Sequence, residues 1–459
     1  MTLITSISGI RGTIGGQPGE ALTPIDAVAF AAAYGTWLIE QNPSVQPLRV
    51  VIGRDARPSG PMVQALVENT LMGLGIHILD CGLSTTPTIE MEVVAKQAQG
   101  GIILTASHNP VQWNALKLLN AQGEFLSAAD GEALLEKVKN GNFSFAPVEA
   151  LGEKTEIHDA IERHIESILA LSAVDVEAIR ARKFRIVVDA VNSTGGIAVP
   201  MLLDRLGCQV IELYCEPHGR FPHNPEPLRE HLTEICALVP QSSADMGIVV
   251  DPDVDRLAFV SEKGEMFGEE YTLVAVADYI LGKTPGHAVS NLSSSRALAD
   301  IAARNKSTYS ASAVGEVNVV VEMKRTQAVI GGEGNGGIIY PALHYGRDSL
   351  VGIALFLTHM AYEGGTVSAL RASYPLYAMS KQKAELDPSL NVDSVLERIA
   401  QSYAHEKISS IDGVKIDFAD QWVHLRKSNT EPIVRIYTEA PTQAEADALA
   451  EAFRTELLS

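Results

Sequence analysis

Short β-branched runs alternate with longer stretches of helical periodicity along most of this chain. The first predicted strands are residues 49–52, 76–79 and 101–104. A helix predicted at 61–74 is followed by Gly75, a residue type that commonly ends helices, and Thr23 and Pro24 suit the start of another. Such alternation is typical of a mostly parallel sheet covered by helices.

The same alternation restarts twice. Strands are predicted at 184–188, 209–213, 246–250, 257–261, 288–291 and 328–330, and a helix at 196–206. Beyond Tyr374 the pattern changes to strands at 413–418, 422–426 and 432–437 and a helix at 442–457. The chain is therefore expected to form three similar α/β domains with mixed, mostly parallel sheets and a smaller C-terminal α+β domain.

The length of 459 residues also favours several domains, because one domain usually takes about 100–200 residues. We expect α/β domains at 1–150, 151–255 and 256–368 and the α+β domain at 369–459. Polar loops with the residues of an active site occur in each of these segments. We therefore expect an active-site cleft at the centre, where the domains meet.

The net charge of −20 argues against a nucleic-acid partner, because neutralising phosphates requires a basic surface. The N-terminus lacks a basic stretch followed by an apolar run, and the longest apolar stretch, within 27–39, is too short for a bilayer. The four cysteines form no CxxC pair and are expected to be reduced thiols. These features predict a cytoplasmic protein, monomeric or homodimeric, without a membrane partner.

A serine loop, residues 105–110, follows the predicted strand at 101–104. A side chain at the carboxyl end of a parallel strand lies where α/β sheets place their ligands. Ser107 has the position of a nucleophile, His108 can carry a proton, and Lys117 is a candidate acid/base or phosphate contact. The alternative is a polar surface loop. The sequence is not a GxSxG elbow, which argues against an esterase.

An aspartate loop follows the strand at 246–250. Asp251, Asp253 and Asp255 alternate along an extended chain, so their carboxylates point the same way and repel unless a cation lies among them. Hard oxygen donors suit Mg²⁺, and Arg256 adds a charge for a phosphoryl group. With Glu262 the spacing also imitates an EF-hand calcium loop, although Arg256 occupies the position of its obligatory glycine. A solvated acidic loop is the third alternative.

A glycine-rich loop at 331–337 follows the strand at 328–330. Glycines permit close approach of a ligand, and Glu333 can accept hydrogen bonds from two vicinal sugar hydroxyls. The segment matches neither the P-loop nor the dinucleotide pattern, and its acidic residue would repel phosphate. From these residues alone, a turn and a sugar site remain equally open.

An arginine loop at 426–432 lies between two predicted strands. This loop and the strand after it contain the hydrogen-bond donors that a phosphate dianion requires. They are Arg426, Ser428, Asn429, Thr430 and Arg435. A polar hairpin is the alternative.

In this order, the four loops resemble those of the α-D-phosphohexomutase superfamily over essentially the whole chain. TASHNP at 105–110 resembles the phosphoserine loop, DPDVDR at 251–256 the metal loop, GEGNGG at 332–337 the sugar loop and RKSNTEP at 426–432 the phosphate loop. The family resemblance is also supported by three shorter segments: GIRG at 9–12, GRDAR at 53–57 and Asn192-Ser193.

The resemblance implies a role for each matching residue. Ser107 would be the phosphoserine and, with Asp251, Asp253 and Asp255, a ligand of one Mg²⁺ per chain. Arg11, His108, Lys117 and Arg256 would surround the transferred group. Glu333 and Asn335 would contact the sugar, and the non-reacting phosphate would be held by Arg426, Ser428, Asn429, Thr430 and Arg435.

Three positions depart from the family pattern. Asn335 and Gly337 stand where many members have Ser and His, and Ala115 stands where glycine is usual. Gly337 is expected to widen the loop by removing a side chain. The form GEGNGG is similar to a subset of phosphoglucosamine and phosphomannose mutases.

The implied activity is interconversion of hexose 1-phosphate and hexose 6-phosphate through a phosphoserine and a 1,6-bisphosphate intermediate, with hexose 1,6-bisphosphate as activator. Glucosamine phosphate is the expected substrate, and mannose or glucose phosphate the alternative. A serine phosphatase and a non-catalytic phosphosugar-binding protein are the rival functions. The arginine loop disfavours the phosphatase, which needs no second phosphate grip.

Overall fold

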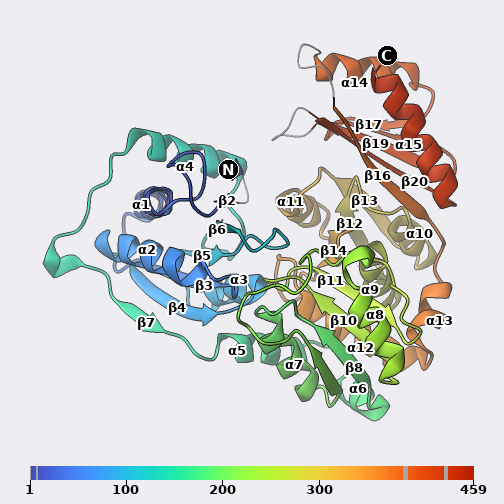
Figure 1. Ribbon diagram of the computed structural model, residues 1–459, viewed down its shortest axis with the longest axis horizontal. Helices are drawn as coiled ribbons and strands as arrows, with labels where there is room; N and C mark the ends of the chain where they lie inside the picture. The colour runs from blue at the N-terminus through green and yellow to red at the C-terminus, as the bar shows by residue number, and fades with distance from the viewer. Residues whose placement is uncertain (1, 7–8, 386–390, 428–432, 459) are drawn as a thin grey trace. The chain divides into compact units, whose positions relative to one another are not determined.

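The structure is a computed structural model that describes residues 2–6, 9–385, 391–427 and 433–458 (Figure 1). The chain divides into two compact units. The first unit contains Met1–Thr272 and Asn335–Ser368, and the second contains Leu273–Gly334 and Ala369–Ser459.

The N-terminal sheet of the first unit has the strand order β1-β2-β6-β5-β3-β4-β7. Its strands are β1 (Leu3–Ser6), β2 (Gly9–Thr13), β3 (Arg49–Arg54), β4 (His77–Leu83), β5 (Gly100–Leu104), β6 (Trp113–Leu119) and β7 (Lys154–Glu156). β3 pairs in parallel with β4 and β5, whereas β6 pairs antiparallel with β5 and β2. The sheet is therefore mixed, and the carboxyl ends of β3, β4 and β5 lie at one edge.

Helices cover both faces of this sheet. On one face, Val50 and Ile52 belong to an apolar core with residues of α1 (Pro24–Gln41), α2 (Gly60–Gly73) and α4 (Ala128–Asn140). On the other face, α3 (Thr86–Ala95) packs so closely that a Cβ at Gly53 or Gly101 would overlap its side chains. The predicted start of α1 is confirmed, because Pro24 is its first residue and Thr23 and Asp26 form a capping box across its first turn.

A second sheet of the first unit has the order β11-β10-β8-β9, with β8 (Arg185–Asp189), β9 (Gln209–Leu213), β10 (Met246–Val250) and β11 (Leu257–Ser261). β8 pairs in parallel with β9 and β10, and β10 and β11 form an antiparallel pair. The other elements of this unit are α5 (Ala160–Leu169), α6 (Val176–Arg182), α7 (Gly195–Arg205), α8 (Thr233–Gln241), β15 (Gly337–Ile339) and α12 (Ser349–Glu363).

In the second unit, β12 (His287–Asn291) pairs in parallel with β13 (Thr308–Ser312) and β14 (Ile330–Glu333). The predicted strand at 328–330 is wrong in extent, because β14 includes part of the expected glycine loop. Gly331 is needed within the strand, since a Cβ there would lie 2.4 Å from the Met323 sulfur of α11 (Glu316–Thr326).

The C-terminal sheet is antiparallel throughout its order β16-β20-β19-β18-β17. It contains β16 (Ala378–Glu385), β17 (Lys407–Ser409), β18 (Val414–Asp417), β19 (Trp422–Lys427) and β20 (Ile433–Ala440). α14 (Val392–Ser402) and α15 (Gln443–Leu458) supply its apolar core (Figure 1). This is the predicted α+β segment.

The remaining longer helices are α9 (Glu269–Lys283), α10 (Ala297–Arg304) and α13 (Val367–Ala372). In the described part of the chain, no helix has both the length and the apolar character needed for a bilayer span.

Candidate active site

Ser107 follows β5 and lies at the carboxyl edge of the N-terminal sheet. Its backbone has φ +48°, a left-handed conformation that non-glycine residues rarely adopt and that is often found at functional sites. Its Oγ donates to Asp251 Oδ2 over 2.6 Å and lies 3.4 Å from His108 Nδ1. The structure therefore brings the predicted nucleophile and the aspartate loop together.

A buried arginine holds the serine loop in this conformation. Arg57 pairs with Asp55 at 2.8 Å and donates to the carbonyls of Ser107, Asn109 and Pro110 over 2.5–2.7 Å. A guanidinium has five N–H donors in a fixed geometry, so it can bind several carbonyl groups of one loop at once. From the sequence, the segment GRDAR at 53–57 was only part of a family resemblance, and Arg57 was given no role. Its position directly after β3, at the carboxyl edge of the sheet, could have indicated one.

Each aspartate of the aspartate loop has at least one oxygen held by protein donors. Asp251 Oδ1 accepts from the backbone N–H groups of residues 255 and 256, each over 3.1 Å. Asp253 Oδ2 accepts from Thr86 Oγ1 over 2.6 Å and from Lys117 Nζ over 2.7 Å. Asp255 Oδ2 accepts from Lys117 Nζ over 3.2 Å and from Arg347 Nη2 over 2.8 Å.

The opposite oxygens of two of these carboxylates are open to a cation. Asp253 Oδ1 and Asp255 Oδ1 are buried and have no hydrogen-bond partner among the described residues. Oxygens of Asp251, Asp253 and Asp255 lie within 4.8 Å of one another. Orphaned buried carboxylate oxygens in an all-oxygen set suit a hard divalent cation such as Mg²⁺.

The EF-hand alternative is wrong for this loop. Strands β10 and β11 flank it where an EF-hand requires helices. Glu262, which would supply the final calcium ligand, accepts instead from the Ser368 N–H over 3.1 Å. The solvated-loop alternative is also wrong, because all three aspartates are fully buried.

Burial and mutual repulsion determine the electrostatics of the triad. Burial, and then the charges of Asp255 and Asp253, raise the pKa of Asp251 well above its usual value. Burial would also raise the pKa of Asp255, but Arg347 and Lys117 outweigh it and lower that pKa. A cation bound among the three carboxylates would oppose the burial and the repulsion that raise the pKa of Asp251.

Lys117 lies on β6, and the two aspartates determine its charge. Burial would lower the pKa of Lys117, but Asp253 and Asp255 raise it above its ordinary value. The charged ammonium is therefore suited to contact a phosphoryl group rather than to act as a base. Burial and then Arg256 lower the pKa of His108 well below its usual value, which leaves that ring neutral at pH 7.

Two more predicted residues lie in this unit. Arg11, on β2, donates from Nη1 to Asn109 Oδ1 over 3.4 Å, and burial followed by the charge of Arg256 lowers its pKa. Arg256 pairs with Glu226 at 3.0 Å, and its buried Nε has no partner among the described residues. Arg11 and Arg256 thus both bring guanidinium groups to the region of the serine and aspartate loops.

Arg347, which sequence analysis missed, explains the unusual Gly337. A Cβ at Gly337 would lie 2.3 Å from Arg347 Cδ. The expectation that Gly337 widens the loop is therefore wrong, since the Arg347 side chain fills that space. Thr86 was also missed, although it follows β4 at the edge where β5 carries Ser107.

The predicted sugar contact Glu333 lies in the second unit, at the end of β14. Its Oε1 accepts from Asn291 Nδ2 over 2.9 Å and from the Gly315 N–H over 3.2 Å. Asn335, the next predicted contact, belongs to the first unit, where its Oδ1 accepts from the Gly337 N–H over 3.2 Å.

Arg426 and Arg435 lie directly opposite each other on the antiparallel strands β19 and β20. Ser428, Asn429 and Thr430, the other predicted phosphate contacts, lie outside the described residues. Asp412, missed by sequence analysis, accepts from Arg426 Nε over 2.9 Å and from the Val314 N–H over 3.0 Å. Because Gly315 donates to Glu333, Asp412 connects the arginine pair to the predicted sugar contact.

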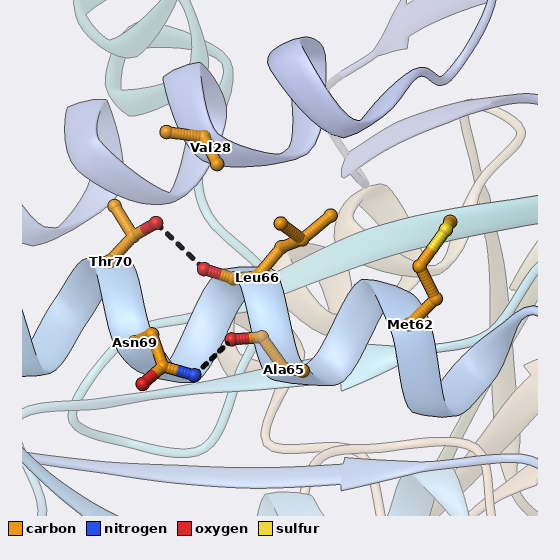
Figure 2. Close-up of a pocket in the computed structure, with 6 residues that line it drawn as sticks. All are labelled: Val28, Met62, Ala65, Leu66, Asn69 and Thr70. Carbon is orange, nitrogen blue, oxygen red and sulfur yellow. Dashed lines mark hydrogen bonds between the residues drawn. The ribbon is translucent and has the colours of Figure 1, made fainter.

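Figure 2 shows a different hollow, on the helical face of the N-terminal sheet. It is lined by Val28 of α1 and by Met62, Ala65, Leu66, Asn69 and Thr70 of α2. The two polar side chains bond to carbonyls of their own helix, Asn69 to Ala65 over 2.6 Å and Thr70 to Leu66 over 2.7 Å. None of these lining residues is ionisable, so this hollow lacks the groups for phosphoryl chemistry.

Comparison with known families accounts for nearly the whole chain. Models of phosphoglucomutase/phosphomannomutase alpha/beta/alpha domains I, II and III match residues 3–145, 162–264 and 268–377. The model of the C-terminal domain of the same family matches residues 381–456.

Individual relatives agree with the family match. A phosphoglucomutase/phosphomannomutase of Thermococcus kodakarensis is 37% identical over 442 residues, 95% of each chain. A probable phosphoglucosamine mutase of Methanopyrus kandleri is 32% identical over 97% of this chain and 96% of its own. A crystal structure of a phosphoglucomutase/phosphomannomutase family protein from Burkholderia thailandensis has the same fold, with a TM-score of 0.85, 24% identity and coverage of 99% and 98%. The chain therefore belongs to the phosphoglucomutase/phosphomannomutase family, within the α-D-phosphohexomutase superfamily, and is an enzyme of the phosphosugar mutase class.

Proposed function

We propose that this enzyme interconverts hexose 1-phosphate and hexose 6-phosphate through phospho-Ser107 and a hexose 1,6-bisphosphate intermediate. The observation that carries the proposal is the 2.6 Å contact of Ser107 Oγ with Asp251, beside the orphaned oxygens of Asp253 and Asp255. A nucleophilic hydroxyl against a carboxylate triad is the arrangement that metal-assisted phosphoryl transfer requires.

Asp251, Asp253 and Asp255, with an oxygen of phospho-Ser107, would hold one Mg²⁺ per chain. When bound, Mg²⁺ polarises the phosphoryl group and offsets its charge as the bond breaks. Thr86, Lys117 and Arg347 orient the carboxylates by occupying their outer oxygens.

In the first transfer, a free hydroxyl of the sugar phosphate attacks the phosphorus of phospho-Ser107. The Ser107 Oγ–P bond breaks, the sugar O–P bond forms, and the hydroxyl proton passes to a basic group of the site. His108 has the position for this role, because its Nδ1 lies 3.4 Å from Ser107 Oγ. After the bisphosphate turns over, Ser107 Oγ attacks its other phosphate. The sugar O–P bond breaks, the Oγ–P bond forms, and the Ser107 proton passes by way of the basic group to the released sugar oxygen. Lys117, Arg11 and Arg256 supply positive charge to the transferring oxygens.

The non-reacting phosphate is assigned to Arg426, Arg435, Ser428, Asn429 and Thr430, and the sugar hydroxyls to Glu333. Hexose 1,6-bisphosphate, which would phosphorylate Ser107 directly, would serve as activator.

The division of the chain into domains after residues 150, 255 and 368 stays a prediction.

Glucosamine phosphate is the proposed preferred substrate. The amide of Asn335 can donate and accept, so it can pair with an amino group or a hydroxyl. Its Oδ1 accepts from the Gly337 N–H over 3.2 Å and has a second lone pair for an amino group, while its amide nitrogen can donate to a hydroxyl. One relative is a phosphoglucomutase/phosphomannomutase and another is a probable phosphoglucosamine mutase. This variety is compatible with a substrate preference that depends on a few such contacts.

The test measures kcat/KM for the 1-phosphates of glucosamine, glucose and mannose, with release of inorganic phosphate followed in parallel. We expect 6-phosphate formation with all or some of these sugars and no stoichiometric phosphate release. Phosphate release without isomerisation would identify a phosphatase instead. Binding without turnover by enzyme treated with Mg²⁺ and bisphosphate would identify a phosphosugar-binding protein.

A further inference from the structure

A second group of potential ligands lies in the first unit, separate from the aspartate triad. His164 of α5 and His344 and Asp348, which precede α12, place one ligand atom each within 4.8 Å of the others. His164 Nε2 lies 2.9 Å and His344 Nε2 lies 3.3 Å from the same oxygen, Asp348 Oδ2. His164 and Asp348 are at most 1% exposed and His344 is 13% exposed by side chain.

The far nitrogen of each ring faces a residue of α3. His164 Nδ1 lies 2.9 Å from Thr88 Oγ1, and His344 Nδ1 lies 3.4 Å from Glu90 Oε2. Metal-bound histidines characteristically have their second nitrogen oriented by such an outer partner, often a carboxylate. The two near nitrogens then converge on one carboxylate oxygen.

The two histidine rings lie beside buried carboxylates. Glu90 and Asp348 are buried carboxylates, and His344 lies between them. Asp348 Oδ1 caps α12 by accepting from the Leu350 N–H over 2.8 Å, so this carboxylate is ionised for a further structural reason. A buried carboxylate faced by two imidazole rings is stabilised by positive charge, which a divalent cation held between Asp348 and the two rings would supply.

The distances suit zinc. Bonds of about 2.0–2.1 Å in a tetrahedral site separate neighbouring ligand atoms by about 3.3 Å, close to the 2.9 and 3.3 Å observed. Two imidazoles and one carboxylate favour Zn²⁺ over Mg²⁺, which prefers oxygen. Gly346 leaves room for the cluster, since a Cβ there would lie 1.7 Å from Glu90 Oε2.

We propose that His164, His344 and Asp348 form a second metal site of this enzyme, a three-ligand site for Zn²⁺ with Thr88 and Glu90 as outer partners. It joins α3, α5 and the segment before α12. Two of these segments, α3 and the segment before α12, also contact the aspartate triad, because Thr86 bonds to Asp253 and Arg347 bonds to Asp255. The proposal goes beyond the mutase activity and does not depend on it.

The test uses the full-length Asp253→Asn protein, in which the triad is weakened, after exhaustive chelation and in excess Mg²⁺. Co²⁺, a coloured substitute for Zn²⁺, and then Zn²⁺ are titrated by absorption spectroscopy and calorimetry. We expect one ion per chain, visible bands of a nitrogen-coordinated site, and a higher thermal midpoint. His344→Gln in the same background should abolish the bands, and His158→Gln, an exposed histidine beside α5, should leave them unchanged.

Glu90→Gln keeps the shape of the outer partner and should weaken Zn²⁺ binding about 10–100-fold, which keeps the test valid if His344→Gln fails to fold. Absence of Co²⁺ bands in the Asp253→Asn protein would overturn the proposal, as would equal binding by the His344→Gln variant. The cluster would then be a hydrogen-bonded group in which protons on the two rings supply the positive charge.

Discussion

Arg347 Nη2 donates to Asp255 Oδ2 over 2.8 Å, from a side chain that occupies the space left by Gly337. The guanidinium shares that oxygen with Lys117, so two cations hold one carboxylate of the triad. The glycine that departs from the family pattern and the arginine beside the metal loop are therefore one structural feature.

Arg347→Met should destabilise the metal-free enzyme by about 3–5 kcal/mol, because it leaves a buried carboxylate with one partner fewer. Added Mg²⁺ should raise the thermal midpoint of the variant more than that of the wild type, since the cation replaces the missing charge. Differential scanning calorimetry with and without Mg²⁺ measures both. Equal gains in the two proteins would contradict the role of Arg347.

Gly337→Ala should reproduce part of this effect, because the new Cβ would lie 2.3 Å from Arg347 Cδ and displace that side chain. Gly282→Ala is the matched control, since its nearest neighbour would be 3.5 Å away. We expect lower thermal stability only for Gly337→Ala. Identical melting of the two variants would show that the arginine adapts without cost.

Ser107→Ala should reduce kcat by about a thousandfold or more while the fold is retained, because the residue carries the transferred group. Ser144→Ala, on an exposed segment, is the control. Mutase assays with added hexose 1,6-bisphosphate measure the loss. Near-normal turnover by the purified variant would exclude Ser107 as the phosphoryl carrier.

Removal of metal should abolish turnover, and Mg²⁺ should restore it, because the proposed transfer needs a cation to polarise the phosphoryl group and offset its charge. Asp253→Asn should require a higher Mg²⁺ concentration, since it removes one ligand charge. Activity as a function of free Mg²⁺ tests this. Full activity after exhaustive chelation would refute the assignment.

Asp412→Ala should raise KM for every hexose phosphate a few-fold to about tenfold, the effect of losing a hydrogen bond worth about 0.5–1.5 kcal/mol. Its contacts with Arg426 and Val314 position groups predicted to bind phosphate and sugar alike. The exposed Asp420→Ala is the control. A change confined to one sugar would argue for a direct sugar contact instead.

The sequence by itself determined the local features. The alternation of strands and helices placed Ser107 after β5 and the three aspartates after β10. Ligands of α/β sheets bind at the carboxyl ends of strands, so these positions indicated a site. Thr23 and Asp26 specify their capping box within four residues. These predictions depend on short-range periodicity and residue type, which a sequence displays directly.

Only the tertiary structure decided which residues complete the site. Arg347 is 92 residues from Asp255 and Thr86 is 167 from Asp253, so no local pattern links them. From the sequence, Gly337 was expected to widen its loop, but in the fold the Arg347 side chain occupies that space. The segment at 331–333 was expected to be a loop, but it belongs to strand β14, and Gly331 packs against α11. Side chains distant in sequence compete for the same space and the same carboxylate oxygens, and that competition is resolved only when the sheets pack.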